Sequence, residues 1–128
     1  MAIDISKVLK AREDVLERKN TFKQSFQVVG VTFEGRQNIL SKYYEEFKRT
    51  GKRRNCELIL EDDNKYDKNA IAVMLVSDSS FEQIGYIAKT ENVRLRESFE
   101  HIKEVCVKDM GVGQNGNIGI TISVTFEA

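Results

Sequence analysis

Near its C-terminus the chain alternates strictly between apolar and small polar residues. Between residues 117 and 126, Asn, Gly, Thr and Ser separate five apolar side chains: Ile118, Ile120, Ile122, Val124 and Phe126. Because successive side chains of a strand point to opposite faces of a sheet, this period of two predicts a strand with one buried and one polar face. Such a strand needs neighbouring strands and a second layer over its apolar face.

Five further segments have the length and composition of strands. They are rich in β-branched, aromatic or other apolar residues, and they lie at 26–33, 55–61, 70–76, 82–88 and 103–109. Helical spacing of apolar residues predicts helices at 3–19, 36–49 and 90–100, the last capped by Thr90. Six strands and two to three flanking helices predict a mainly β (α+β) fold, as a small barrel or strongly curved sheet.

The charges of the chain balance, since 20 Lys and Arg face 20 Asp and Glu. A protein that coats long nucleic acids must neutralise many phosphates, so a net charge of zero argues against that class. It still allows a local basic patch or the recognition of a strand end. The densest basic patch consists of Lys48, Arg49, Lys52, Arg53 and Arg54. Such a run is either a solvated helix end or a patch that steers phosphates.

The two cysteines, Cys56 and Cys106, lie far apart inside apolar runs. We expect two buried free thiols in a reducing compartment. Neither these residues nor His101, the only histidine, have the spacing of zinc ligands, so no metal and no cofactor are expected. No secretory signal or apolar run of membrane-spanning length is visible in the sequence. We therefore expect an intracellular, cytoplasmic protein without a membrane partner, nucleoid-associated if prokaryotic.

Residues 111–116 match the GxGxxG pattern of dinucleotide-binding sites. That motif works only between a strand and a helix, where the helix N-terminus meets the pyrophosphate. Here a strand is predicted to follow. We therefore interpret Asn115 and Gly116 as a hairpin turn, because both residues tolerate a positive φ.

An acidic cluster, Glu61, Asp62, Asp63 and Asp67, follows the second predicted strand. It does not fit an EF-hand, because Tyr66 and Asp67 stand where a ligand and a glycine are required. A solvated acidic turn is the favoured interpretation. A small metal-dependent nuclease is the alternative that these carboxylates leave open.

Residues 64–71, Asn-Lys-Tyr-Asp-Lys-Asn-Ala-Ile, form a polar segment with an aromatic residue and an acid that leads directly into a predicted buried strand. This segment is similar to the signature Asn-Pro-Tyr-Asp-x-Asn-Ala-Ile of the HIRAN family, and residues 26–89 resemble a HIRAN domain. Residues 28–33 resemble the opening strand of the family, 56–61 its second strand, and 84–87 the Gly-aromatic-Leu strand that follows the signature. Residues 1–24 would then be an N-terminal helical extension, and 25–128 the HIRAN-like domain.

The resemblance implies a six-stranded OB-like barrel. Many HIRAN domains are attached to an ATPase motor, but the sequence contains no P-loop, so we expect the domain without the motor. In helicase-linked members the domain holds the 3′ end of single-stranded DNA. One aromatic ring comes from the first strand and one from the signature loop, and the signature aspartate meets the terminal hydroxyl. Stacking contributes on the order of 1–3 kcal/mol per base whatever the base is. A carboxylate accepts a hydrogen bond from a hydroxyl and repels a phosphate.

Carried over to this chain, the resemblance makes Phe33 and Tyr66 the stacking pair and Asp67 the acceptor of the 3′-hydroxyl. The further residues implied along the bound strand are Asn64, Tyr86 and Lys89. Three positions depart from the DNA-binding members of the family: Lys65 replaces proline, Phe33 replaces tyrosine, and Thr32 replaces an arginine that would contact a phosphate. Lys65 and the patch around Arg53 are candidates to supply that contact.

We therefore expect a non-enzymatic nucleic-acid-binding module that recognises single-stranded DNA, preferentially 3′ ends, in DNA repair or replication. One alternative is a protein-interaction or assembly module, such as a homodimer formed through the predicted helix at 3–19. It is favoured by that extra amphipathic helix and by the missing arginine at position 32. The second alternative is the metal-dependent nuclease.

Overall fold

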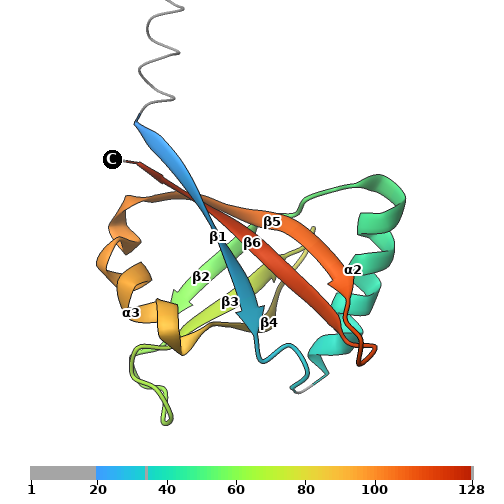
Figure 1. The fold of residues 1–128 in the computed structure, drawn as a ribbon, viewed down its shortest axis with the longest axis horizontal. Helices are drawn as coiled ribbons and strands as arrows, with labels where there is room; N and C mark the ends of the chain where they lie inside the picture. Colours follow the sequence, from blue (N-terminus) through green and yellow to red (C-terminus); the bar gives the residue numbers. More distant parts are fainter. Residues whose placement is uncertain (1–19, 34, 128) are drawn as a thin grey trace, which may run out of the picture.

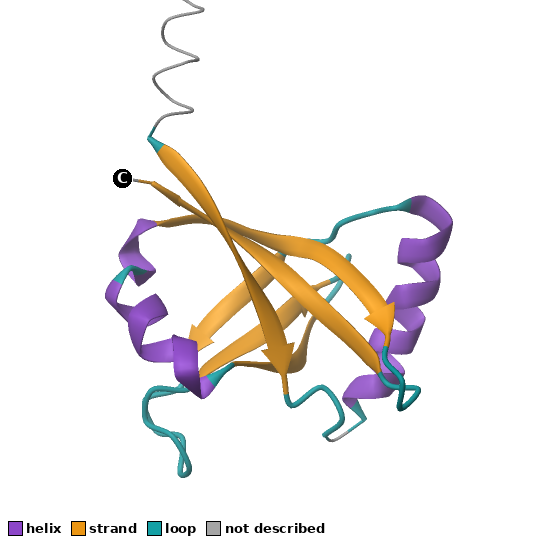
Figure 2. Ribbon diagram, in the orientation of Figure 1, coloured by secondary structure: helices purple, strands orange, loops and turns teal. Residues whose placement is uncertain are grey.

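The computed structural model describes residues 20–33 and 35–127, and the predicted helix at 3–19 lies outside them. The elements in chain order are β1 (Thr21–Val29), α2 (Arg36–Thr50), β2 (Cys56–Leu60), β3 (Ile71–Val76), β4 (Phe81–Ile87), α3 (Lys89–Glu97), a single 3-10 turn (Phe99–His101), β5 (Ile102–Val112) and β6 (Ile118–Glu127). The mainly β prediction is confirmed. The two helices flank the sheet at opposite sides (Figures 1 and 2).

One antiparallel sheet of six strands, in the order β2-β3-β4-β1-β6-β5, forms the body of the molecule. The sheet bends at β1, which pairs with β6 over Thr21–Gln27 and with β4 only at Val28 and Val29. The bend brings the end strands together at one isolated bridge, Asn55 to Cys106. Of the two predicted forms, a small barrel or a strongly curved sheet, the structure has the curved sheet, which is not closed into a barrel. β2 and β5 are in contact but are not paired as neighbouring strands, and the bridge involves Asn55, the residue before β2, so the curved sheet stays open.

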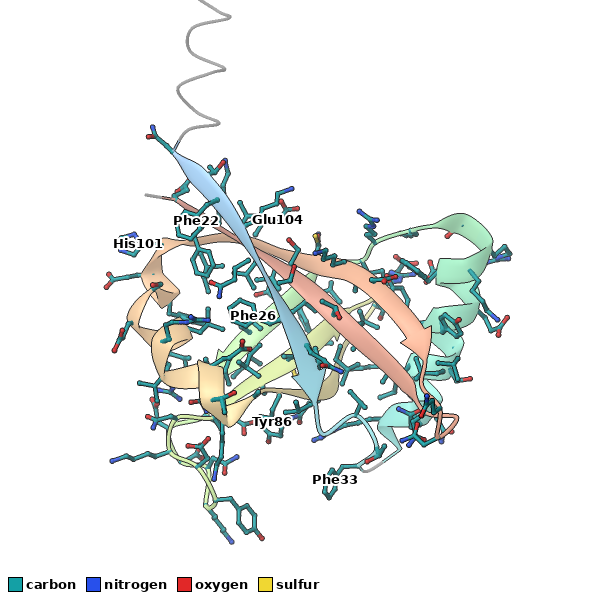
Figure 3. The ribbon with its side chains drawn as sticks, viewed as in Figure 1. Phe22, Phe26, Phe33, Tyr86, His101 and Glu104 are labelled. Carbon is teal, nitrogen blue, oxygen red and sulfur yellow. The ribbon has the colours of Figure 1, made fainter. Side chains whose placement is uncertain are left out.

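The core fills the inside of this curved sheet. All five apolar residues of the alternating C-terminal segment are buried, as predicted, with Ile122 and Val124 at 0% exposure. Phe26 of β1 points into the same interior (Figure 3). The helix α2 contributes Leu40 and Tyr43 and packs against β4, β5 and β6. Shortening a buried isoleucine such as Ile122 to alanine typically costs about 2–5 kcal/mol.

The predicted limits of the first strand are wrong at both ends. β1 begins at Thr21, so residues 21–24 belong to the sheet and not to an N-terminal extension. Pairing with β6 holds this part, and the ring of Phe22 stacks on that of Phe126 with 5.1 Å between centroids. The strand ends before Gly30, whose φ of 71° turns the chain. Residues 31–33 are consequently a turn and not a strand.

Two other local predictions can be compared with the structure. Helix α3 begins at Lys89, and Thr90 is not its cap, because the Ala88 carbonyl accepts the first hydrogen bonds of the helix. The GxGxxG segment is a hairpin turn between β5 and β6, as interpreted. The Gly113 N–H donates to the Asn117 carbonyl over 2.9 Å, and Gly116 has a φ of 81°.

Both cysteines are free thiols, Cys56 buried and Cys106 only partly buried. Burial raises the pKa of Cys56 to about 12. Within residues 20–33 and 35–127, no helix is both long enough and apolar enough to cross a membrane.

Candidate nucleic-acid interface

A groove of about 570 Å³ opens at one end of the sheet. Its walls come from the turn after β1, the loop between β2 and β3, and the junction of β4 with α3. Six of the eight residues predicted to bind nucleic acid line it: Phe33, Asn64, Tyr66, Asp67, Tyr86 and Lys89. Figure 3 shows Phe33 and Tyr86 at this end of the molecule. Segments more than 50 positions apart in sequence therefore meet at one site, as they would in a binding site assembled by the fold.

The two predicted stacking rings are open to solvent. Phe33 is 63% exposed and Tyr66 is 91% exposed. Both rings line the groove and are therefore accessible to a molecule that enters it. Neither ring is used to fill the core.

The turn that carries Phe33 is fastened by a side chain from α2. Gln37 Nε2 donates to the carbonyls of Val31 and Ile118, both over 3.0 Å, and its Oε1 accepts from the Ile118 N–H over 2.8 Å. These bonds join the turn, the helix and the start of β6. The hydrogen bonds of Gln37 therefore hold the backbone of the turn from which the Phe33 side chain projects.

Asn64 organises the signature loop. Its Oδ1 accepts hydrogen bonds from the backbone N–H groups of Tyr66 and Asp67, over 2.9 and 3.0 Å. Its Nδ2 donates to Glu61 Oε1 over 3.0 Å, and the Tyr86 hydroxyl donates to the same oxygen over 2.8 Å. A short polar side chain that caps its own turn in this way is a common loop device. The polar groups of Asn64 therefore build the site, and the ring of Tyr86 forms its wall.

Asp67 is half-buried, and both of its oxygens accept hydrogen bonds. Oδ1 accepts from the Asn69 N–H over 2.9 Å, and Oδ2 accepts from Asn92 Nδ2 over 2.8 Å. The Asn69 N–H and, to a lesser degree, the Asn92 amide lower the pKa of Asp67 below its usual value. Each carboxylate oxygen has two acceptor positions, so one remains on each for a ligand hydroxyl. The carboxylate is ionised at neutral pH and is held in one orientation.

Helix α3 braces this loop from the side with two residues that the sequence did not single out. Asn92 is 2% exposed and holds Asp67. Arg96 donates to the carbonyls of Asn69 and Ala70, each over 2.9 Å, and pairs with an oxygen of Asp62 at 2.7 Å. Asn92 and Arg96 are four positions apart, and this spacing predicts that they share one face of a helix. The spacing does not predict which residues of the loop they contact.

Arg36 is a charged residue of the groove that was not predicted from the sequence. Its side chain is 7% exposed, its guanidinium carbon lies 5.4 Å from the centre of the Tyr86 ring, and Nη1 donates to the Gly30 carbonyl over 2.7 Å. Arg36 is the first residue of α2, where the helix dipole disfavours a cation. A basic residue at the N-terminus of a helix is unfavourable, and this feature of the sequence could have drawn attention to Arg36.

Two predicted residues lie outside the groove. Thr32 lines a separate hollow beside the β5–β6 hairpin, because the turn directs positions 32 and 33 to different sides. Lys65 is exposed on the signature loop and is not among the residues that line the groove.

The predicted basic patch, Lys48, Arg49, Lys52, Arg53 and Arg54, is also remote from the groove. It begins twelve positions after Arg36 on α2, which corresponds to about 18 Å along the helix. Arg54 is bound by both oxygens of Glu46 at 2.9 Å and holds the pKa of Glu46 below its usual range. Lys48 pairs with Glu45 at 3.1 Å. The five patch residues are therefore not part of this groove.

Most carboxylates of the acidic cluster accept hydrogen bonds from other side chains of the protein. Glu61, Asp62 and Asp67 accept hydrogen bonds from Asn64, Arg96 and Asn92. Across the described part of the chain, no group of three or more His, Cys, Asp or Glu side chains is placed to hold a metal ion.

Comparisons with known proteins give no family. No protein-family model matches the chain, and no curated protein matches it. Among solved structures, a protein from Lactobacillus plantarum determined by a structural genomics consortium is similar, with a TM-score of 0.48 and 19% sequence identity. The alignment covers 84% of this chain and 99% of that chain. A likeness at this level identifies neither a family nor a function.

Proposed function

We propose that the groove binds the 3′ end of single-stranded DNA and that the chain is a HIRAN-like nucleic-acid-binding module, acting in DNA repair or replication inside the cell. The observation that carries the proposal is the composition of the groove. It brings two exposed rings, Phe33 and Tyr66, together with an oriented, ionised carboxylate, Asp67. No catalytic step is assigned to it.

The chemistry of the groove suits a strand end. Its volume of about 570 Å³ lies inside the usual range of small-ligand sites, about 300–1,000 Å³. Stacking on Phe33 and Tyr66 is indifferent to the identity of the base. Asp67 offers a free acceptor position to a hydroxyl, whereas a phosphate at the same place would face a like charge. Such a site needs few cations, in agreement with a net charge of zero.

Fluorescence anisotropy with a 5′-labelled oligothymidylate tests the proposal. Phe33→Ala and Tyr66→Ala should each weaken binding by about 5- to 150-fold, the equivalent of 1–3 kcal/mol per stacked base. Phe81→Ala is the matched control, because Phe81 is equally exposed, at 62%, but stands at the other end of β4 from Tyr86. No binding by the unaltered protein, or equal affinity in all three variants, would refute the proposal. Self-assembly through residues 3–19 stays a prediction.

A further inference from the structure

Arg36 places a positive charge inside the groove that no described carboxylate neutralises. The side chain is 7% exposed, yet the salt bridges among residues 20–33 and 35–127 involve Lys48, Arg54, Arg96 and Lys103 and not Arg36. Of the five N–H donors of the guanidinium, one is bound to the Gly30 carbonyl. A buried charge is costly unless an anion pairs with it. The arrangement therefore points to an anion that arrives with a ligand.

The surroundings of Arg36 are built to keep the guanidinium in place. It lies over the Tyr86 ring, whose hydroxyl is fixed by Glu61. A Cβ at Gly30 would lie 3.2 Å from Nη1, so a glycine there lets the guanidinium approach the turn. The start of α2 adds partial positive charge, since it has no side-chain cap and no acidic residue in its first turn.

We infer that Arg36 forms a phosphate subsite for the last phosphodiester of the bound strand, an inference that rests on the proposed function. It supplies the phosphate contact that Thr32 does not provide. Asp67 lines the same groove from another element, the loop between β2 and β3. A strand end carries a hydroxyl on one side of the terminal sugar and a phosphodiester on the other. With the hydroxyl at Asp67 and the phosphodiester at Arg36, the two charges set the direction in which the strand enters.

A single neutral linkage in the DNA tests the inference. Two 5′-labelled oligothymidylates are compared, one with natural linkages and one with a methylphosphonate at the 3′-terminal linkage. The unaltered full chain should bind the neutralised strand about tenfold more weakly or worse, as expected for loss of one charged hydrogen-bonded contact. Arg36→Gln should bind the natural strand more weakly than the unaltered chain does, by the same factor. It should bind the two strands with equal affinity. A methylphosphonate at the 5′-terminal linkage is the control and should have little effect.

Equal affinity of the unaltered protein for the two strands overturns the inference, as does full discrimination by Arg36→Gln. Because Arg36 also holds Gly30, Arg36→Lys is included. It retains the charge and should still discriminate, which a purely structural role would not produce.

Failure of the proposed function is distinguished by a second readout. If the unaltered chain binds no oligonucleotide, inorganic phosphate is titrated and the backbone amides of Gly30 and Tyr86 are followed by NMR. Shifts that vanish in Arg36→Gln support the subsite even though the DNA proposal fails. The absence of any shift in the unaltered chain overturns the subsite as well.

Discussion

Asn92 on α3 donates a hydrogen bond from Nδ2 to Asp67 Oδ2 over 2.8 Å, across 25 positions of sequence. This bond ties the loop that carries Tyr66 to a helix, and it aims the carboxylate into the groove. Because Asn92 is 2% exposed, its amide has little access to water as an alternative partner. The same bond therefore serves both the stability of the loop and the orientation of the proposed ligand group.

Exchanging the two side chains separates these roles. Asp67→Asn alone weakens the pair, because two amides replace an amide and a carboxylate, and it should lower stability by about 1–3 kcal/mol. Adding Asn92→Asp restores a donor and an acceptor, and it should recover part of the loss in urea unfolding. The double variant carries its charge at position 92, away from the ligand, so it should bind DNA without preferring a free 3′ end. A preference unchanged in the double variant would show that the charge at position 67 is not what recognises the end.

The low pKa of Asp67 predicts a pH window for its contribution to stability. The Asn69 N–H and the Asn92 amide favour the ionised form, so its pKa is lower in the folded than in the unfolded chain. The contribution is fully present above the unfolded value, about 3.9, and is lost as the pH falls through the lower folded value. The stability difference between the unaltered protein and Asp67→Asn should be constant from about pH 7 to about pH 5 and shrink only below about pH 4. Urea unfolding over this range measures it, and a difference that already shrinks near pH 6 would contradict the assignment.

Gly85 should be intolerant of any side chain. A Cβ there would lie 2.6 Å from Val28 Cγ1 and would collide with the Val29 carbonyl, where β4 pairs with β1. Gly85→Ala should destabilise the protein by about 1–3 kcal/mol or more, since backbone cannot move aside cheaply. Gly111→Ala is the matched control, because a Cβ at Gly111 meets nothing within 4 Å. Urea unfolding should leave the control within about 0.5 kcal/mol of the unaltered protein. Equal effects would mean that close packing at Gly85 is not required.

Gln37 should matter for stability although it is polar and on a helix. Gln37→Ala removes three hydrogen bonds to backbone groups of Val31 and Ile118. Leaving such part-buried groups unpaired should cost about 1–3 kcal/mol in chemical unfolding. Asn38→Ala, at the exposed neighbouring position, should cost less than about 0.5 kcal/mol. A Gln37 variant as stable as the Asn38 variant would show that the turn is held by other contacts.

Local patterns anticipated much of the fold. The strand β6 was predictable because burial of one face leaves a period of two in the sequence itself. The hairpin before it was predictable from Asn115 and Gly116. The start of β1 was missed because Thr21–Gln24 has one apolar residue, Phe22, and that residue is exposed. Pairing with β6 holds this segment, and backbone pairing leaves little trace in side-chain composition.

The candidate site, like the fold, was only partly predictable from the sequence. The loop around Tyr66 stood out because a polar segment with an aromatic residue leads directly into a buried strand. Arg36 and Asn92 did not stand out, because their roles depend on which strands and helices become neighbours. The order of the strands decides that, and no local spacing encodes it. The misplacement of Thr32 has a similar cause, since a turn and not a strand carries it.

Recognition of the 3′ end by Asp67 is tested most directly with two oligothymidylates that differ only in their 3′-terminal group. One ends in a 3′-hydroxyl and the other in a 3′-phosphate. Anisotropy of the 5′ label should show that the unaltered chain prefers the hydroxyl by about tenfold or more, the value of one charged hydrogen bond. Asp67→Asn should reduce that preference. Equal affinity for the two ends would show that Asp67 does not recognise the end of the strand.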